Sequence, residues 1–259
     1  MSTDELASPG AGDQNACAAY DQFILFGDSI TQMSTDQNPG FSFYAALQQD
    51  YIRLIDVVNR GFSGYNTAHA IKVFPKFFPA PQMVRVRFLS IFFGANDSVL
   101  DQYYQHVPLE DYKENLRAIV GHPLTRAQRP RILILTPPPV SEYMLEAIED
   151  VRGSRTASNT KRYADACREV ANSLDIPVVD IWSAFMGIAG WHDGQALPGS
   201  KDIPRNVNLE NLLSDGLHLS AQGYKIMFNE FMHVIRAVWP DQAPDALPMV
   251  FPGWETAPK

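Results

Sequence analysis

The chain has 259 residues and a formal net charge of −8. Its length fits one large α/β domain, and its 46% of hydrophobic residues is ordinary for a globular protein with a substantial core. Nucleic acids and anionic membranes attract clustered Lys and Arg, so the acidic balance disfavours both as partners. The sequence lacks both a bilayer-length apolar stretch and a signal-peptide pattern at its start. We therefore expect a cytoplasmic protein with no membrane insertion.

Residues 1–20 are rich in small and polar side chains, which predicts a disordered leader. Beyond them, short apolar runs alternate with segments of helical spacing. Most of these runs lack a sustained apolar/polar alternation, which is typical of strands covered on both faces. The five predicted strands lie within residues 23–26, 52–58, 84–93, 131–136 and 176–181.

Apolar residues at helical spacing predict helices around residues 43–51, 108–120 and 163–174. A last helix is expected over residues 221–238, with Ser220 to cap it and Pro240 to end it. The alternation predicts a three-layer α/β/α sandwich around a five-stranded parallel sheet, as in flavodoxin-like folds. Ligands bind such sheets at the carboxyl ends of the strands, so we looked for chemistry there.

We assign residues 21–240 to this one domain and residues 241–259 to an extended C-terminal tail. The tail carries Val250, Phe251 and Trp254 among several prolines. Because this apolar content is unfavourable in water, we expect the tail to pack on its own domain or on a neighbouring subunit. If the tail packs on a neighbouring subunit, the protein is a homodimer.

Ser29 follows the first predicted strand in the segment Gly27-Asp28-Ser29. Gly27 permits a tight strand-to-helix turn, and an amide in the first turn of a helix has no intrahelical acceptor. Ser29 can therefore serve as a nucleophile in this turn. Taken alone, the segment also fits an ordinary turn in which Asp28 or Ser29 caps the helix.

Two further strand ends carry residues suited to stabilising negative charge. Gly64 lies in the loop after the second predicted strand, and Gly94-Ala95-Asn96-Asp97 follows the third. A glycine lets a ligand approach the backbone, and an Asn side chain can donate to a developing oxyanion. A loop glycine and an Asx turn are the alternative interpretations.

Asp215 and His218 lie three residues apart on a short segment before the last predicted helix. At this spacing the carboxylate can reach one ring nitrogen and leave the other free to face a nucleophile. The alternative is a capping aspartate beside a surface histidine.

Together these segments resemble the four signature blocks of the SGNH (GDSL) hydrolase family. The blocks are GDSIT at residues 27–31, the Gly64 loop, GAND at residues 94–97 and DGLH at residues 215–218. The stretches FFGANDS, QHVPLEDYKENLR and DGLHLSAQGY are similar to the isoamyl acetate-hydrolysing esterases within that family. The resemblance implies a serine esterase with the catalytic triad Ser29, Asp215 and His218.

The same resemblance implies an oxyanion hole made by the N–H groups of Ser29 and Gly64 and by the side chain of Asn96. It assigns Asp28 and Asp97 to the support of loop geometry. The implied reaction requires no metal and no organic cofactor.

The expected substrate is a small neutral ester, such as an acetate of a small alcohol. A lysophospholipase, a thioesterase and a sugar deacetylase use the same triad and remain alternatives. From other classes, we considered a metal-dependent phosphoesterase using Asp28, Asn96, Asp97 and His218, and a non-catalytic binding module. Candidates for an apolar substrate wall are Tyr103, Tyr104, Met144, Phe185, Met186, Trp191 and Leu197.

Overall fold

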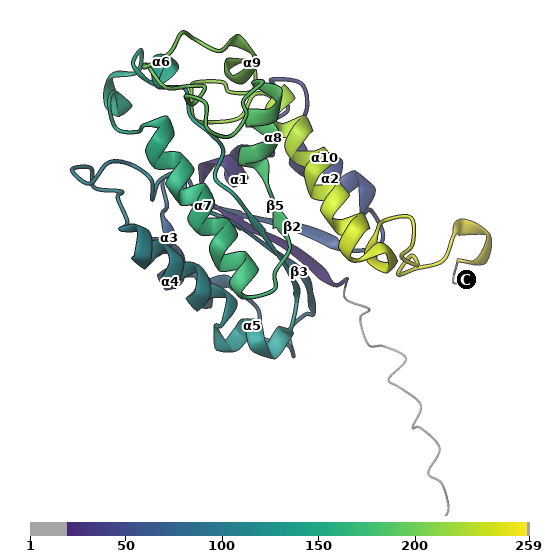
Figure 1. The fold of residues 1–259 in the computed structure, drawn as a ribbon. Coiled ribbons are helices and arrows are strands. Elements are labelled where there is room, and N and C mark those ends of the chain that lie inside the picture. The colour runs from purple at the N-terminus through teal and green to yellow at the C-terminus, as the bar shows by residue number, and fades with distance from the viewer. Residues whose placement is uncertain (1–19, 258–259) are drawn as a thin grey trace, which may run out of the picture.

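The computed structural model describes residues 20–257, and the predicted leader up to residue 19 lies outside them. Five parallel strands form one sheet in the order β2-β1-β3-β4-β5. This order is that of flavodoxin-like folds. The predicted α/β/α sandwich is confirmed (Figure 1). The strands are β1 (Gln22–Gly27), β2 (Asp56–Gly61), β3 (Val86–Phe92), β4 (Arg131–Leu135) and β5 (Val178–Val179).

Helices cover both faces of the sheet (Figure 1). One face packs against α2 (Phe43–Asp50), α8 (Ile181–Ile188) and α10 (Ala221–Val238). The other packs against α3 (Thr67–Phe77), α4 (Leu109–Val120) and α7 (Ala157–Ser173). No helix among residues 20–257 combines the length and apolarity needed to cross a membrane. The shorter elements are α1 (Ser29–Met33), α5 (Pro123–Gln128), α6 (Glu142–Leu145), η1 (Glu149–Val151), α9 (Val207–Glu210), η2 (Pro240–Gln242) and η3 (Trp254–Thr256).

The central strand β1 contributes side chains to the hydrophobic cores on both faces of the sheet. Phe23 and Leu25 belong to the core on the α2, α8 and α10 face, and Ile24 and Phe26 to the core on the opposite face. All four side chains are at most 2% exposed. Because both faces of the strand are buried, its sequence is continuously apolar rather than alternating.

Two predicted strands have wrong boundaries. The second begins at Asp56 and not at residue 52, because the chain still turns after α2, with Arg53 at φ 65°. The fifth is only two residues long, because Asp180 already caps α8 by accepting from the Ser183 N–H at 3.1 Å. The apolar run around it therefore belongs partly to a helix.

The tail is held against the domain by its backbone. The Tyr51 hydroxyl donates to the Gln242 carbonyl at 3.1 Å, and the Val250 N–H donates to the Arg53 carbonyl at 3.0 Å. Trp254 in η3 is 84% exposed. A homodimer that covers this part of the tail stays a prediction.

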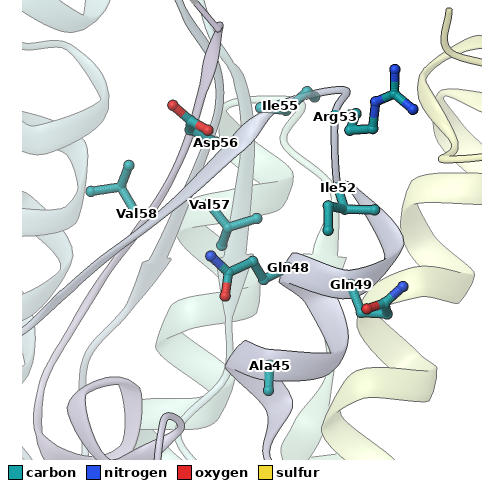
Figure 2. A pocket seen from close by; sticks show the side chains of 9 residues that line it. All are labelled: Ala45, Gln48, Gln49, Ile52, Arg53, Ile55, Asp56, Val57 and Val58. Atoms are coloured by element: carbon teal, nitrogen blue, oxygen red, sulfur yellow. The ribbon is translucent and has the colours of Figure 1, made fainter. Parts of the chain in front are cut away.

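A hollow of about 440 Å³ lies at the β2 edge of the sheet, between that strand and α2 (Figure 2). Strand edges present free carbonyls that attract further strands. Here the Tyr44 hydroxyl donates to the Val57 carbonyl at 2.8 Å, and Arg60 donates to the Asn59 carbonyl at 3.0 Å. Side chains of the chain itself thus occupy part of this edge, and the hollow contains none of the predicted site residues.

The end of β2 lies against α1 with no room for a side chain. A Cβ on Gly61 would lie 2.1 Å from the Gln32 backbone nitrogen. This contact sets the distance between α1, which begins with Ser29, and the neighbouring strand end.

Gly61→Ala is therefore expected to lower the free energy of unfolding by about 1–3 kcal/mol, because backbone atoms must shift to admit the methyl group. Gly187→Ala is the matched control, since a Cβ there meets nothing within 4 Å and the residue lies in α8. Its methyl group should instead raise the unfolding free energy by about 0.5–1 kcal/mol through helix propensity. Urea denaturation of both variants checks this, and equal values for the two would contradict the close approach.

Candidate active site

Ser29 lies at the carboxyl end of the central strand β1. Asp28 caps α1, and its side chain accepts from the Ile30 N–H at 2.9 Å. Ser29 is the first residue of the helix and is 5% exposed. The cap therefore fixes the backbone on which the serine stands.

His218 approaches Ser29 from the loop before α10. Its Nε2 lies 2.9 Å from the Ser29 Oγ, and its Nδ1 lies 2.6 Å from the Asp215 Oδ2. The other Asp215 oxygen accepts from the Leu217 N–H at 2.9 Å and the His218 N–H at 2.8 Å. The structure thus joins the three predicted residues in one chain of hydrogen bonds. Tyr224 of α10, the helix that follows the His218 loop, donates to the Ile30 carbonyl of α1 at 2.7 Å and so connects the two elements.

Asp215 is held in its ionised form. Partial burial raises the pKa of its carboxyl, but hydrogen bonds from the side chain and backbone of His218 outweigh this and lower the pKa to about 2. A carboxylate that stays ionised can hold the Nδ1 proton of His218 and stabilise an imidazolium.

The predicted oxyanion residues come from two neighbouring loops. Gly64 follows β2 with φ at 79°, and its carbonyl accepts from the Gln105 side chain at 2.8 Å. Asn96 follows β3, is 4% exposed, and its Nδ2 donates to the Tyr65 carbonyl at 2.9 Å. This bond uses one of the two Nδ2 protons and leaves the second for another acceptor.

Asp28 and Asp97 are both buried beneath these loops, at 1% and 0% exposed. Burial raises the pKa of Asp28 to about 7, although the Ile30 N–H opposes this. Burial also raises the pKa of Asp97 to about 6, against hydrogen bonds from the hydroxyl and N–H of Thr67. Asp97 thereby joins the loop after β3 to the first turn of α3, which suits its predicted supporting role.

The sequence profile of the GDSL-like lipase/acylhydrolase family matches residues 25–226. The chain belongs to this family. The isoamyl acetate-hydrolyzing esterase 1 homolog of Mus musculus is 34% identical over 262 residues, covering 98% of this chain and 93% of that protein. GDSL esterase/lipase WDL1 of Oryza sativa subsp. japonica is 33% identical and covers 84% of this chain and 78% of that protein.

The solved lipase/acylhydrolase from Enterococcus faecalis has a TM-score of 0.60 to this GDSL hydrolase at 22% identity. The match covers 84% of this chain and 96% of that one. A solved acetyl xylan esterase, AlAXEase, has the same TM-score at 15% identity, covering 83% and 99%. At these identities the likeness shows the fold alone. The predicted family and the enzyme class, a carboxylic ester hydrolase, are confirmed.

A cleft of about 400 Å³ opens beside His218 in this GDSL hydrolase. Its walls include both apolar and polar side chains, among them Met33, Asp36, Pro39, Leu219 and Tyr224.

The predicted apolar wall is wrong in part. Phe185 and Met186 are 0% and 1% exposed and pack into the cores under α8, so they do not face a substrate. Tyr104 is 91% exposed.

Sequence reasoning missed Arg155, which donates from Nη2 to the Asn96 Oδ1 at 3.1 Å. It also missed Thr67, which donates to Asp97, and the Tyr65 carbonyl, which accepts from Asn96. No motif or spacing in the sequence distinguishes this arginine from a surface one. Among residues 20–257, no three His, Cys, Asp or Glu side chains are grouped so as to hold a metal ion.

Stability should fall as the pH rises from about 4 to about 7. The pKa of Asp28, about 7, exceeds that of an unfolded aspartate, so over this range the folded state keeps a proton that the unfolded state has lost. For one such group, the unfolding free energy should decrease by roughly 2.5 kcal/mol between pH 5 and pH 8. Asp28→Asn keeps the acceptor for Ile30 and removes the charge, so it should flatten this slope and leave the part due to Asp97.

Denaturant unfolding at pH 5 and pH 8 measures this slope. Asp193→Asn, at an exposed position, is the control and should keep the wild-type slope. An equal slope in Asp28→Asn and the wild type would contradict the assignment of the effect to Asp28.

Proposed function

We propose that this GDSL hydrolase cleaves short-chain esters of small alcohols through an acyl-enzyme on Ser29. The observation that carries the proposal is the hydrogen-bonded chain Asp215–His218–Ser29, with its contacts of 2.6 and 2.9 Å. A serine hydroxyl is a weak nucleophile until an adjacent base takes its proton, and His218 Nε2 is within reach to do so.

In the proposed reaction, the Ser29 Oγ attacks the ester carbonyl while its proton moves to the His218 Nε2. The imidazolium then gives this proton to the leaving alcohol, and Asp215 stabilises the charged ring throughout. Water, activated by His218 in the same way, attacks the acyl-enzyme and releases the acid. Protons balance within the triad, so the reaction needs no cofactor.

Charge develops on the carbonyl oxygen during both attacks. We assign its stabilisation to the N–H groups of Ser29 and Gly64 and to the free Nδ2 proton of Asn96. The first amide of a helix, such as that of Ser29 in α1, has no intrahelical acceptor and can donate to the oxyanion.

The size of the substrate is inferred from the relatives and not from the cleft beside His218, because that cleft is lined by neither Ser29 nor Asn96. The names of the mouse and human relatives, isoamyl acetate-hydrolyzing esterase 1 homolog, support an acetate ester. A lysophospholipase, a thioesterase and a sugar deacetylase would differ in the groups they accept. The cytoplasmic location stays a prediction.

Ser29→Ala should lower the turnover of p-nitrophenyl acetate by on the order of 10⁴-fold or more, as loss of a triad nucleophile does. Wild-type activity should persist in EDTA. It should fall along the p-nitrophenyl esters acetate, butyrate and decanoate, and isoamyl acetate should be hydrolysed as well. Near-normal turnover by a clean Ser29→Ala preparation would overturn the mechanism. A preference for decanoate, thioesters or acetylated sugars would leave the mechanism and replace the substrate.

Asn96→Ala should lower kcat by on the order of 10²–10³-fold and leave KM nearly unchanged, because the lost hydrogen bond forms mainly in the transition state. Steady-state kinetics with p-nitrophenyl acetate measures both constants. A change confined to KM would show that Asn96 binds substrate and does not stabilise the oxyanion.

A further inference from the structure

Arg155 is a buried charged residue outside the predicted site. It follows Ser154 just before Thr156, the N-cap of α7, and it is 4% exposed. Burial lowers the pKa of its guanidinium, while the charges of Asp28 and Asp215 raise it. A guanidinium stays charged in proteins, so the fold accepts a buried cation here.

Two of the three side-chain hydrogen bonds of Arg155 go to adjacent residues of the loop after β3. Its Nε donates to the Ala95 carbonyl at 3.1 Å, and its Nη2 donates to the Asn96 Oδ1 at 3.1 Å. Its Nη1 donates to the Ser154 hydroxyl at 3.2 Å. The rigid fork of a guanidinium can hold two neighbouring acceptors at a fixed spacing, which a lysine ammonium cannot do. Arg155 thus holds both the backbone and the side chain of the loop after β3.

These contacts fix which way the Asn96 amide faces. Arg155 can only donate, and the Tyr65 carbonyl, which accepts from Nδ2 at 2.9 Å, can only accept. A flipped amide would place donor against donor and acceptor against acceptor. Arg155 and Tyr65 therefore leave one orientation, in which the remaining Nδ2 proton is available to a substrate oxygen.

We infer that Arg155 is a positioning residue for ester hydrolysis, which acts by holding the Asn96 amide with its N–H toward the oxyanion. This inference rests on the oxyanion role proposed for Asn96. A donor already held in place loses little free energy to reorganisation when charge develops, which is where a fixed amide accelerates the reaction. The positive charge of the Arg155 guanidinium beside Oδ1 also polarises the amide and strengthens its N–H as a donor.

The test is a double-mutant cycle of Arg155→Met and Asn96→Ala, measured as kcat and KM on p-nitrophenyl acetate. Arg155→Met alone should lower kcat by about 10- to 100-fold with less than about a 3-fold change in KM. In the Asn96→Ala background the same substitution should change kcat by less than about 3-fold, because its target is already gone. Arg126→Met is the control, since Arg126 is an exposed arginine of α5, and it should keep wild-type kinetics.

The outcomes separate the two proposals. If Asn96→Ala keeps wild-type kcat, the oxyanion role of Asn96 fails and this inference fails with it. Asn96→Ala can slow turnover while the fold-changes in kcat of the two single variants multiply in the double variant. In that case, or if Arg155→Met has no effect, only the role of Arg155 is overturned. If Arg155→Met does not fold, Arg155→Lys takes its place in the cycle. Lysine keeps the charge but not the two-point hold, so an unchanged kcat in Arg155→Lys would overturn the inference.

Discussion

The close approach of the ends of β1 and β2 to α1 determines where Ser29 stands. A Cβ on Gly27 would lie 2.0 Å from the Thr31 hydroxyl oxygen in α1 and 2.7 Å from the Phe92 carbonyl at the end of β3, and one on Gly61 would lie 2.1 Å from the Gln32 nitrogen in α1. Both positions exclude side chains, so α1 lies directly on the ends of β1 and β2, and the end of β3 lies close beside that of β1. The loops that carry Gly64 and Asn96 leave from those same ends. The geometry of the site therefore follows from backbone packing before any polar contact is made.

Electrostatics differ sharply between the buried base of the site and its opening. Burial dominates at Asp28 and raises its pKa to about 7, whereas hydrogen bonds dominate at the half-buried Asp215 and lower its pKa to about 2. An aspartate at the buried base therefore takes up a proton at a much higher pH than the aspartate beside His218. Arg155 adds a cation to the buried part and so compensates carboxylates that do ionise.

The sequence predicted those features that follow from local rules. The strand-end rule located the segments of Ser29, Gly64 and Asn96, and the three-residue spacing of Asp215 and His218 predicted their contact. Resemblance to a family joined these segments into one site. What the sequence did not predict depends on tertiary packing. The run around residue 180 is apolar because α8 is buried, and periodicity does not distinguish that from a strand. Phe185 and Met186 are equally apolar in a core and in a substrate wall, and Arg155 differs from a surface arginine only in its three-dimensional surroundings.

The proposed reacting groups come from the two ends of the domain. Ser29 and His218 are 189 residues apart, and between them the chain builds β2 to β5 and the helices that cover them. The 2.9 Å contact between them is formed with α10 packed on the sheet, where Tyr224 bonds to the Ile30 carbonyl. The proposed oxyanion donors come instead from loops after β1, β2 and β3, and Arg155 from the loop after β4. Nucleophile activation therefore depends on the packing of the last helix, whereas charge stabilisation depends on the strand ends. Loosening α10 should impair the first function before the second.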